Sequence, residues 1–188
     1  MNSLLGNITQ LAQFLIQERI KPGDFVIDGT AGNGHDTLFL AKLVSDNGKV
    51  YSFDIQSQAI EYTKEKLLKE SLFNRVELIM SSHECIKKYV KNKIKVAMFN
   101  LGYLPGGNHS ITTKGNSTIL ALEQVLELLL PGGIISICLY CGHSEGIKEL
   151  ELVNSFLDTL NNKDYNVVKL NYVNKKNDPP KLVLIEKN

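Results

Sequence analysis

Apolar positions along the chain alternate between two kinds of spacing. Residues such as Ile8, Leu11, Ala12, Leu15 and Ile16 recur every three or four positions, which is typical of a helix packed on one side. Short continuous apolar runs, bounded by turn residues, are typical of buried strands. The pattern predicts strands over 25–28, 50–55, 75–82, 96–100, 134–140, 165–172 and 181–186. It predicts helices at about 8–20 and over 58–69, 83–90, 117–130 and 145–160, and a further helix that follows the first strand and ends at residue 44.

Helices that alternate with strands favour a mostly parallel sheet covered on both faces. Only a short polar stretch, 174–180, separates the last two strands, so these should pair as an antiparallel hairpin. We therefore expect one α/β domain over residues 1–188. It should have a Rossmann-like, seven-stranded, mostly parallel sheet with an antiparallel C-terminal hairpin, helices on both faces and the N-terminal helix as a cover.

Composition narrows the class of protein. Apolar residues make up 43% of the 188 residues and charged residues 22%, as in ordinary globular proteins, and no apolar run approaches a membrane span. No secretory signal is visible, and three cysteines without a framework favour a reducing compartment, so we expect a cytoplasmic protein without membrane attachment. A net charge of +1 argues against nucleic-acid binding by bulk electrostatics but leaves room for a local basic patch.

A glycine-rich loop follows the first predicted strand, in the segment Asp28-Gly29-Thr30-Ala31-Gly32-Asn33-Gly34. Such a loop lets a ligand approach the backbone at the start of the next helix, but its spacing differs from the Gly-x-Gly-x-x-Gly of dinucleotide sites. Asp28 is equally explained as a turn residue, and Asp36 as an acid at a helix N-terminus. The candidate ligand-binding residues here are Asp28, Thr30, Gly32, Asn33, Gly34, Asp36 and Thr37.

The next two strands also end in polar residues. Asp54 ends the second strand, where a carboxylate can accept hydrogen bonds from a ribose diol, and Gln56 lies beside it. The alternative for Asp54 is a cap on the following helix. Ser82 and His83 follow the third strand and suit either a helix cap or contacts with the edge of an adenine. Together these residues predict a nucleoside-bearing ligand.

The fourth predicted strand ends in a second unusual segment, Asn100-Leu101-Gly102-Tyr103, which continues to His109. Asn100 offers a side-chain carbonyl that can orient an amine, and Tyr103 can stack on an extruded base or simply cover the end of the sheet. His109 and His143 are candidate proton acceptors, although each is also explained as an ordinary loop histidine. Cys138 and Cys141 lie on a predicted strand without a second ligand pair, so we expect no metal site.

The glycine loop, the acid after the second strand, the Leu130-Pro131-Gly132-Gly133 turn and the closing hairpin resemble the class I S-adenosylmethionine-dependent methyltransferases. The further combination of residues 28–37 with 100–107 is similar to the YtqB-type methylase family. That resemblance implies S-adenosylmethionine as cofactor and methylation of the aminomethyl nitrogen of 5-aminomethyl-2-thiouridine at the tRNA wobble position. From their chemistry, Asn100, Tyr103 and His109 are the predicted catalytic residues, and Asn100 is also a predicted donor contact. The segment from Asn100 to Tyr103 resembles the Asn/Asp-Pro-Pro-Tyr loop of amino-methylating enzymes that act on nucleobases. It departs from that loop in having Leu101 and Gly102 in place of the two prolines.

If tRNA is the substrate, the domain itself must hold the anticodon arm, and a homodimer would help it do so. Lysines in two stretches are candidates for phosphate contacts, although lysine runs are usually solvated faces. They are Lys87, Lys88, Lys91, Lys93, Lys95, Lys175 and Lys176. Other hypotheses remain open: a methyltransferase acting on rRNA or a small molecule, a nicotinamide-dependent oxidoreductase, and a ligand-binding protein without catalysis.

Overall fold

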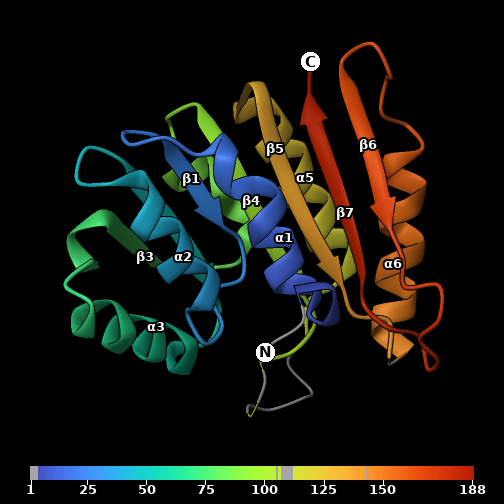
Figure 1. Cartoon of the computed structure of the whole chain (residues 1–188), viewed down its shortest axis with the longest axis horizontal. Coiled ribbons are helices and arrows are strands. Elements are labelled where there is room, and N and C mark those ends of the chain that lie inside the picture. The colour runs from blue at the N-terminus through green and yellow to red at the C-terminus, as the bar shows by residue number, and fades with distance from the viewer. Residues whose placement is uncertain (1–3, 105, 107–111, 143) are drawn as a thin grey trace.

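A seven-stranded sheet forms the centre of the molecule, with strand order β3-β2-β1-β4-β5-β7-β6 (Figure 1). The computed structural model describes residues 4–104, 106, 112–142 and 144–188. The strands are β1 (Phe25–Asp28), β2 (Lys49–Asp54), β3 (Val76–Met80), β4 (Ile94–Leu101), β5 (Leu129–Leu139), β6 (Tyr165–Leu170) and β7 (Lys181–Lys187). β1 to β5 pair in parallel, whereas β7 is antiparallel to both neighbours. The predicted mostly parallel, Rossmann-like sheet with its antiparallel hairpin is confirmed.

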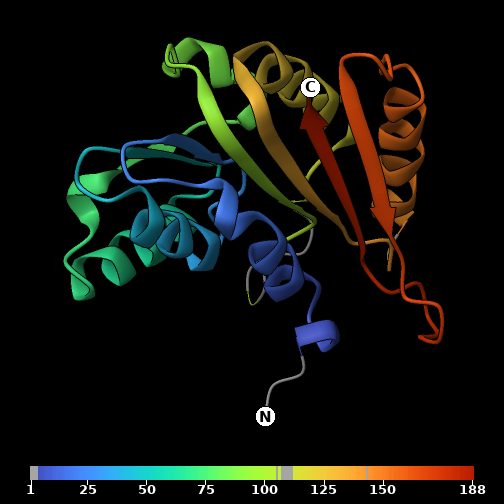
Figure 2. The ribbon, with the colours of Figure 1, turned by 45° about the horizontal axis from the view of Figure 1, so that its top comes forward.

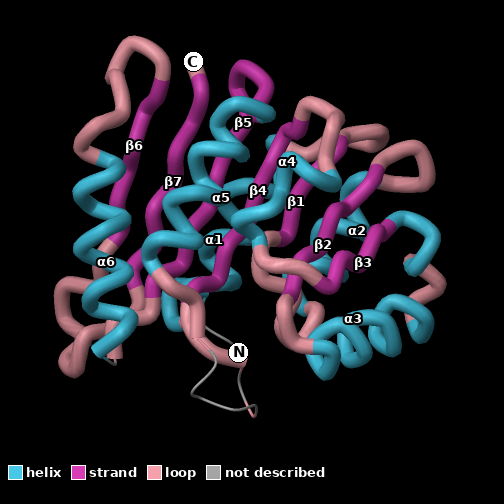
Figure 3. The backbone as a smooth tube through the Cα atoms, turned by 180° about the vertical axis from the view of Figure 1, so that it is seen from behind, coloured by secondary structure: helices cyan, strands magenta, loops and turns pink. Residues whose placement is uncertain are grey.

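Helices cover both faces of this sheet, as predicted. They are α1 (Ile8–Ile16), α2 (His35–Val44), α3 (Ser57–Lys69), α4 (Ile86–Tyr89), α5 (Gly115–Leu128) and α6 (Ser144–Leu157). Short 3₁₀ turns lie at Leu4–Gly6, Gln17–Arg19, Phe73–Arg75 and His83–Cys85. Figure 1 shows α1, α2 and α3 in front of the sheet, and Figure 3 shows α4, α5 and α6 behind it.

Two apolar cores correspond to these two layers. On one face Ala12 and Ile16 of α1 and Leu40 of α2 are fully buried against strand residues such as Val26 and Val96. On the other face residues of α5 and α6 pack on the sheet, among them Leu122, Val125 and Val153. Because the central strands are buried on both faces, their sequences are continuously apolar rather than alternating.

One predicted boundary is wrong. The Pro131-Gly132-Gly133 turn was expected to separate a helix from the strand beginning at residue 134, but β5 already begins at Leu129, directly after α5. Leu129 pairs with Ile94, and the register then shifts so that Ile134 pairs with Val96. The turn residues are therefore an irregularity inside a strand, a place where proline and glycine are tolerated.

The carboxyl ends of β1, β2, β3, β4 and β5 meet along one edge of the sheet, where ligands bind in open α/β folds. Since β7 runs in the opposite direction, the connection between β6 and β7 also lies at this edge, close to the N-terminal segment (Figure 2). Within the described residues, none of the helices has the length and apolar character needed to cross a bilayer.

Candidate active site

A cleft of about 1230 Å³ runs along the carboxyl edge of the sheet. Its walls come from the loops after β1 to β5, from α1 and from the β6–β7 connection. Ten of the residues predicted to form the site line it: Thr30, Gly32, Asn33, Asp36, Asp54, Gln56, Ser82, His83, Asn100 and Tyr103. Segments far apart in the sequence therefore meet in one cavity that is large enough for a nucleoside-bearing ligand together with an acceptor.

Asp28 and Thr37 lie beneath the cleft rather than in its wall. Both are fully buried, and the Thr37 hydroxyl donates to Asp28 Oδ2 (2.6 Å) while the Thr30 amide donates to Oδ1 (3.0 Å). The Thr37 hydroxyl also lies 2.8 Å from the Ser52 hydroxyl on β2. Asp28 therefore fixes the glycine loop to the start of α2, which is a supporting role that the sequence left open.

Burial, followed by the charge of nearby Asp36, raises the pKa of Asp28 to about 7. The unfolded chain keeps a pKa near 3.8, so between about pH 4 and pH 7 the folded state binds more protons than the unfolded state. We expect the free energy of unfolding to fall in this window as the pH rises, by up to about 1.4 kcal/mol per pH unit for this group. Urea titrations across the window should show a shallower slope for Asp28→Asn than for wild type. Asp158→Asn, at an exposed position, is the control and should show the wild-type slope of unfolding free energy against pH. An equally steep slope in Asp28→Asn would show that other groups cause the pH dependence.

Two glycines in this loop, Gly29 and Gly34, are required by close packing. A Cβ on Gly34, whose φ is +74°, would lie 2.9 Å from the backbone of Thr63 on α3, and a Cβ on Gly29 would lie 2.2 Å from the Phe99 ring on β4. Gly34 therefore lets α2 and α3 approach each other and does not itself line the cleft. Gly29 brings the loop against the centre of the sheet.

We expect Gly29→Ala to lower the free energy of unfolding by about 1–3 kcal/mol, because the added methyl group must displace the buried Phe99 ring. Urea denaturation measures the change. Gly142→Ala is the matched control, since no atom lies within 4 Å of the position that its added methyl group would take. Equal stability of the two variants would show that the Phe99 ring moves aside freely.

Asp54 joins the loop after β2 to the glycine loop. Its Oδ2 accepts from the Gly32 amide and its Oδ1 from the Gln56 amide, both at 2.9 Å. Helix α3 begins after Gln56 without a side-chain cap, so Asp54 does not cap it. The carboxylate is held in the cleft wall with lone pairs left for further donors, as recognition of a ribose requires.

Asn100 is the centre of a hydrogen-bonded group that connects β4, α2 and α1. Its backbone amide donates to the Thr30 hydroxyl (2.7 Å), and its side-chain amide donates to Asp36 Oδ2. Gln13 of α1 donates to the other oxygen of Asp36 (2.6 Å). A carboxylate accepts, so the Asn100 nitrogen must face Asp36 and its oxygen must face away. Among the described residues, the buried Asn100 Oδ1 has no hydrogen-bond partner.

Asp36 is itself buried, and burial raises its pKa, whereas the hydrogen bonds from Gln13 and Asn100 lower it. Its charge also raises the pKa of Asp28, as does that of Asp54. Three carboxylates thus surround the glycine loop, and a cationic ligand would relieve their mutual repulsion.

His83 follows β3 and also lines the cleft. Its Nδ1 is 3.1 Å from the Gly29 carbonyl oxygen, and its ring meets Phe99 edge to face. A carbonyl only accepts, so Nδ1 carries the proton and Nε2 presents a lone pair. Burial lowers the pKa of His83, which favours this neutral form. Neighbouring Ser82 caps the 3₁₀ turn by accepting from the Glu84 amide (3.4 Å), in agreement with the cap interpretation.

The segment after Asn100 is anchored on the far side of the cleft. The Thr113 amide donates to the Gly102 carbonyl (2.9 Å), and Tyr103 forms a bridge with Thr112. Buried Glu149 of α6 accepts from the hydroxyls of Thr113 (2.7 Å) and Thr118 (2.6 Å). Tyr103 is 41% exposed at the cleft wall, a position compatible with stacking on a base.

Two predicted candidates, His109 and His143, lie outside the described residues. Within the described residues no group of three or more His, Cys, Asp or Glu side chains is arranged to hold a metal ion. Cys138 and Cys141 are buried free thiols, and burial raises the pKa of both. The described residues thus offer carboxylates, amides and a neutral imidazole.

Two contributors to the site were not predicted from the sequence. Gln13 lies on the helix that was expected only to cover the sheet, yet it binds Asp36, and Thr9, Gln10 and Gln13 of α1 all line the cleft. In the sequence, these three polar residues lie beside the apolar stripe of the helix, and they were the pattern that could have indicated this contribution. No sequence pattern indicated a role for Glu149, because the threonines whose hydroxyls donate to it, Thr113 and Thr118, lie in a distant segment of the chain.

A family model described as "Putative rRNA methylase" matches residues 50–186. A solved structure from Clostridium thermocellum, described in the same words, is 44% identical, with a TM-score of 0.94 over 100% of this chain and 99% of its own. A Streptococcus mutans protein solved in complex with SAH is 37% identical, with a TM-score of 0.89 over 97% of this chain and 98% of its own.

Among curated proteins, the chloroplastic tRNA (mnm(5)s(2)U34)-methyltransferase of Arabidopsis thaliana is 39% identical over 178 residues. That alignment covers 89% of this chain and 65% of the plant protein, so the chain spans just under two thirds of that relative's length. The family match covers most of the chain, and the similarity to the solved structures extends over nearly all of it. The chain belongs to the rRNA methylase family defined by that model.

Proposed function

We propose that this protein transfers a methyl group from S-adenosylmethionine to the aminomethyl nitrogen of 5-aminomethyl-2-thiouridine at the wobble position of tRNA. The observation that carries the proposal is the buried Asn100 Oδ1, which has no hydrogen-bond partner among the described residues and lies at the wall of a cleft that also contains the glycine loop. The name of the plant relative, a tRNA methyltransferase for this nucleotide, supports the choice of acceptor.

The residues of the cleft fit the proposed cofactor. The backbone of the glycine loop and the carboxylates of Asp36 and Asp54 suit a ligand with a sulfonium, an ammonium and a ribose. His83 Nε2 can accept a hydrogen bond from an amino group of the cofactor, since it has no hydrogen-bond partner among the described residues. When bound, S-adenosylmethionine supplies an electrophilic methyl group whose departure leaves a neutral thioether.

Asn100 would position the acceptor amine. Its Oδ1 accepts one N–H of the neutral amine and so directs the nitrogen lone pair toward the methyl carbon. Asp36 and Gln13 keep the Asn100 amide in the required orientation. The nitrogen–carbon bond forms as the carbon–sulfur bond breaks, and the amine then releases one proton to solvent. Tyr103, exposed beside Asn100, would stack on the extruded base.

The decisive experiment incubates the protein with S-adenosylmethionine and tRNA that carries the aminomethyl uridine, followed by mass analysis of the nucleosides. We expect one added methyl group on that nucleoside and none on rRNA offered in parallel. Methylation of rRNA alone would favour the substrate in the family description. Donor binding without transfer to either RNA would favour a small-molecule acceptor, and calorimetric binding of NAD in place of S-adenosylmethionine would contradict the proposal.

A further inference from the structure

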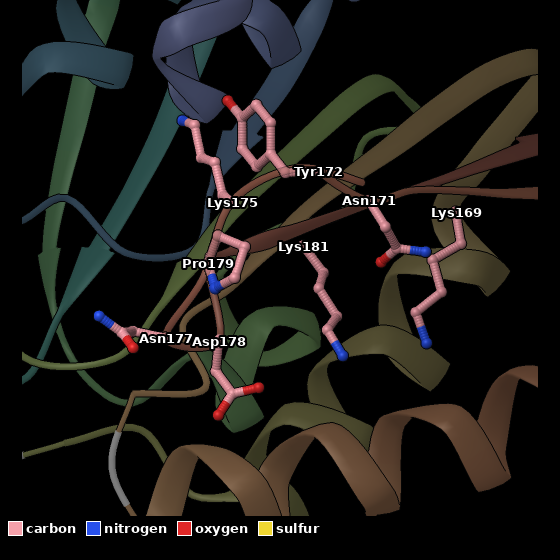
Figure 4. Close-up of a pocket in the computed structure, with 8 residues that line it drawn as sticks. All are labelled: Lys169, Asn171, Tyr172, Lys175, Asn177, Asp178, Pro179 and Lys181. Carbon is pink, nitrogen blue, oxygen red and sulfur yellow. The ribbon is translucent and has the colours of Figure 1, made fainter.

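A second, separate pocket of about 390 Å³ lies in the β6–β7 connection (Figure 4). Three lysines contribute to its wall, Lys169 from the end of β6, Lys175 from the connection and Lys181 from the start of β7. Asn171 and Tyr172 lie between the first two, and Asp178 supplies the single carboxylate among its lining residues. A pocket with three ammonium groups and one carboxylate is suited to an anion.

This pocket adjoins the proposed active site. Lys181 pairs with Leu139 at the carboxyl end of β5, because β7 runs antiparallel to β5. Asp178 lines both the pocket and the cleft, and the next two residues divide between them, Pro179 in the pocket and Pro180 in the cleft. A chain molecule with one unit in the cleft could therefore place a neighbouring unit in the pocket.

Lys169 and Lys181 project from the same face of the hairpin. Lys169 is opposite Val183, and Lys181 precedes Val183 by two residues, which puts both side chains on one side of the sheet. Figure 4 shows both amines directed toward the helix below, and Lys169 Nζ donates to Asn154 Oδ1 of α6 (2.6 Å). Lys175 points the other way, where its Nζ lies 3.6 Å from the centre of the Tyr172 ring.

Two lysines of the run at residues 87–95 make contacts within the protein. Lys87 forms an ion pair with Glu127, and Lys93 donates to the Glu127 carbonyl (2.9 Å), at the edge of the sheet away from the cleft. Among the described residues, neither Lys169 nor Lys181 has a carboxylate within ion-pair distance. Their charges are therefore available to an external anion. None of the lysines from the run at residues 87–95 lines the cleft or the pocket.

We propose that Lys169 and Lys181 bind a backbone phosphate of the RNA substrate, adjacent to the nucleotide whose base enters the cleft. This assignment rests on the proposed function. Lysine binds phosphate as a point charge, and such contacts fix the register of a nucleic acid without reading its sequence. A protein with a net charge of only +1 would in this way place positive charge in the pocket that adjoins the cleft, where a phosphate of the RNA would bind.

The test compares the double variant Lys169→Ala/Lys181→Ala with wild type, using a fluorescent anticodon stem-loop and measuring anisotropy over a range of KCl concentrations. We expect Kd to rise roughly tenfold. The slope of log Kd against log salt should fall by about 0.7 for each phosphate of single-stranded RNA that the variant no longer neutralises. Lys64→Ala/Lys69→Ala on the exposed side of α3 removes the same charge elsewhere and should behave as wild type.

Methylation assays and calorimetry complete the test. The double variant should show a raised KM for tRNA, an unchanged kcat at saturation and wild-type affinity for S-adenosylmethionine. Unchanged RNA affinity and salt slope in the double variant, with an active wild type, would overturn the phosphate site and leave the proposed function intact. A wild type that neither binds nor methylates RNA would overturn both.

Discussion

Replacing Asn100 with alanine is expected to lower kcat for methyl transfer by about 10²–10³-fold, the range found when a single preorganised polar contact at a reacting group is removed. The variant removes the only side-chain oxygen that β4 presents at the cleft wall among the described residues, and with it the group proposed to orient the amine. Single-turnover assays with tRNA and saturating S-adenosylmethionine measure the chemical step directly.

Donor affinity separates this explanation from general damage to the site. Calorimetry should show that Asn100→Ala binds S-adenosylmethionine within a few-fold of wild type, because the proposed donor contacts lie mainly in the loops after β1 and β2. Asn74→Ala, an exposed asparagine near the start of β3, should retain full activity. A single-turnover rate for Asn100→Ala close to that of wild type would remove Asn100 from the mechanism.

Asp54→Ala is expected to weaken S-adenosylmethionine binding by at least about 100-fold. Hydrogen bonds to a charged group are worth about 1.5–3 kcal/mol each, and the proposed ribose contact would use two. The variant also releases the amides of Gly32 and Gln56, so the glycine loop loses its tie to β2. Isothermal titration with both S-adenosylmethionine and its demethylated product measures the loss.

Two controls define the role of the Asp54 carboxylate. Asp54→Asn keeps one acceptor oxygen and should bind with intermediate affinity, whereas Asp158→Ala on an exposed surface should bind as wild type. If Asp54→Ala binds the donor within about threefold of wild type, the ribose does not contact Asp54.

Sequence patterns were sufficient for the sheet because long apolar runs and helical spacing are local properties. The start of β5 was missed because Pro131 and the two following glycines normally end an element. Here the residues on either side of them, Leu129 and Ile134, both pair with β4. The reversed β7 was predictable, since the residues between the last two strands are too few for a crossover helix.

The site was predictable only in part, for a related reason. A residue type at a strand end identifies the edge at which a ligand binds, and this located Asp54, His83 and Asn100 at the cleft. It does not say whether a side chain faces the cleft or the layer below, and Asp28 turned out to support the loop from below. Gln13 lies among polar residues that the sequence of α1 displays, but its partner Asp36 is 23 residues away, and no local pattern encodes that contact.

The antiparallel orientation of β7 brings the β6–β7 connection to the binding edge, on the side away from β1 and β2. The loops after β1 and β2 would bind the donor, while the β4 segment and the β6–β7 connection form the other side. Insertions or exchanges in the β6–β7 connection could then change which RNA is accepted without disturbing the donor loops. Substrate preference in this fold could thus diverge, in evolution or in the laboratory, by exchange of a single hairpin.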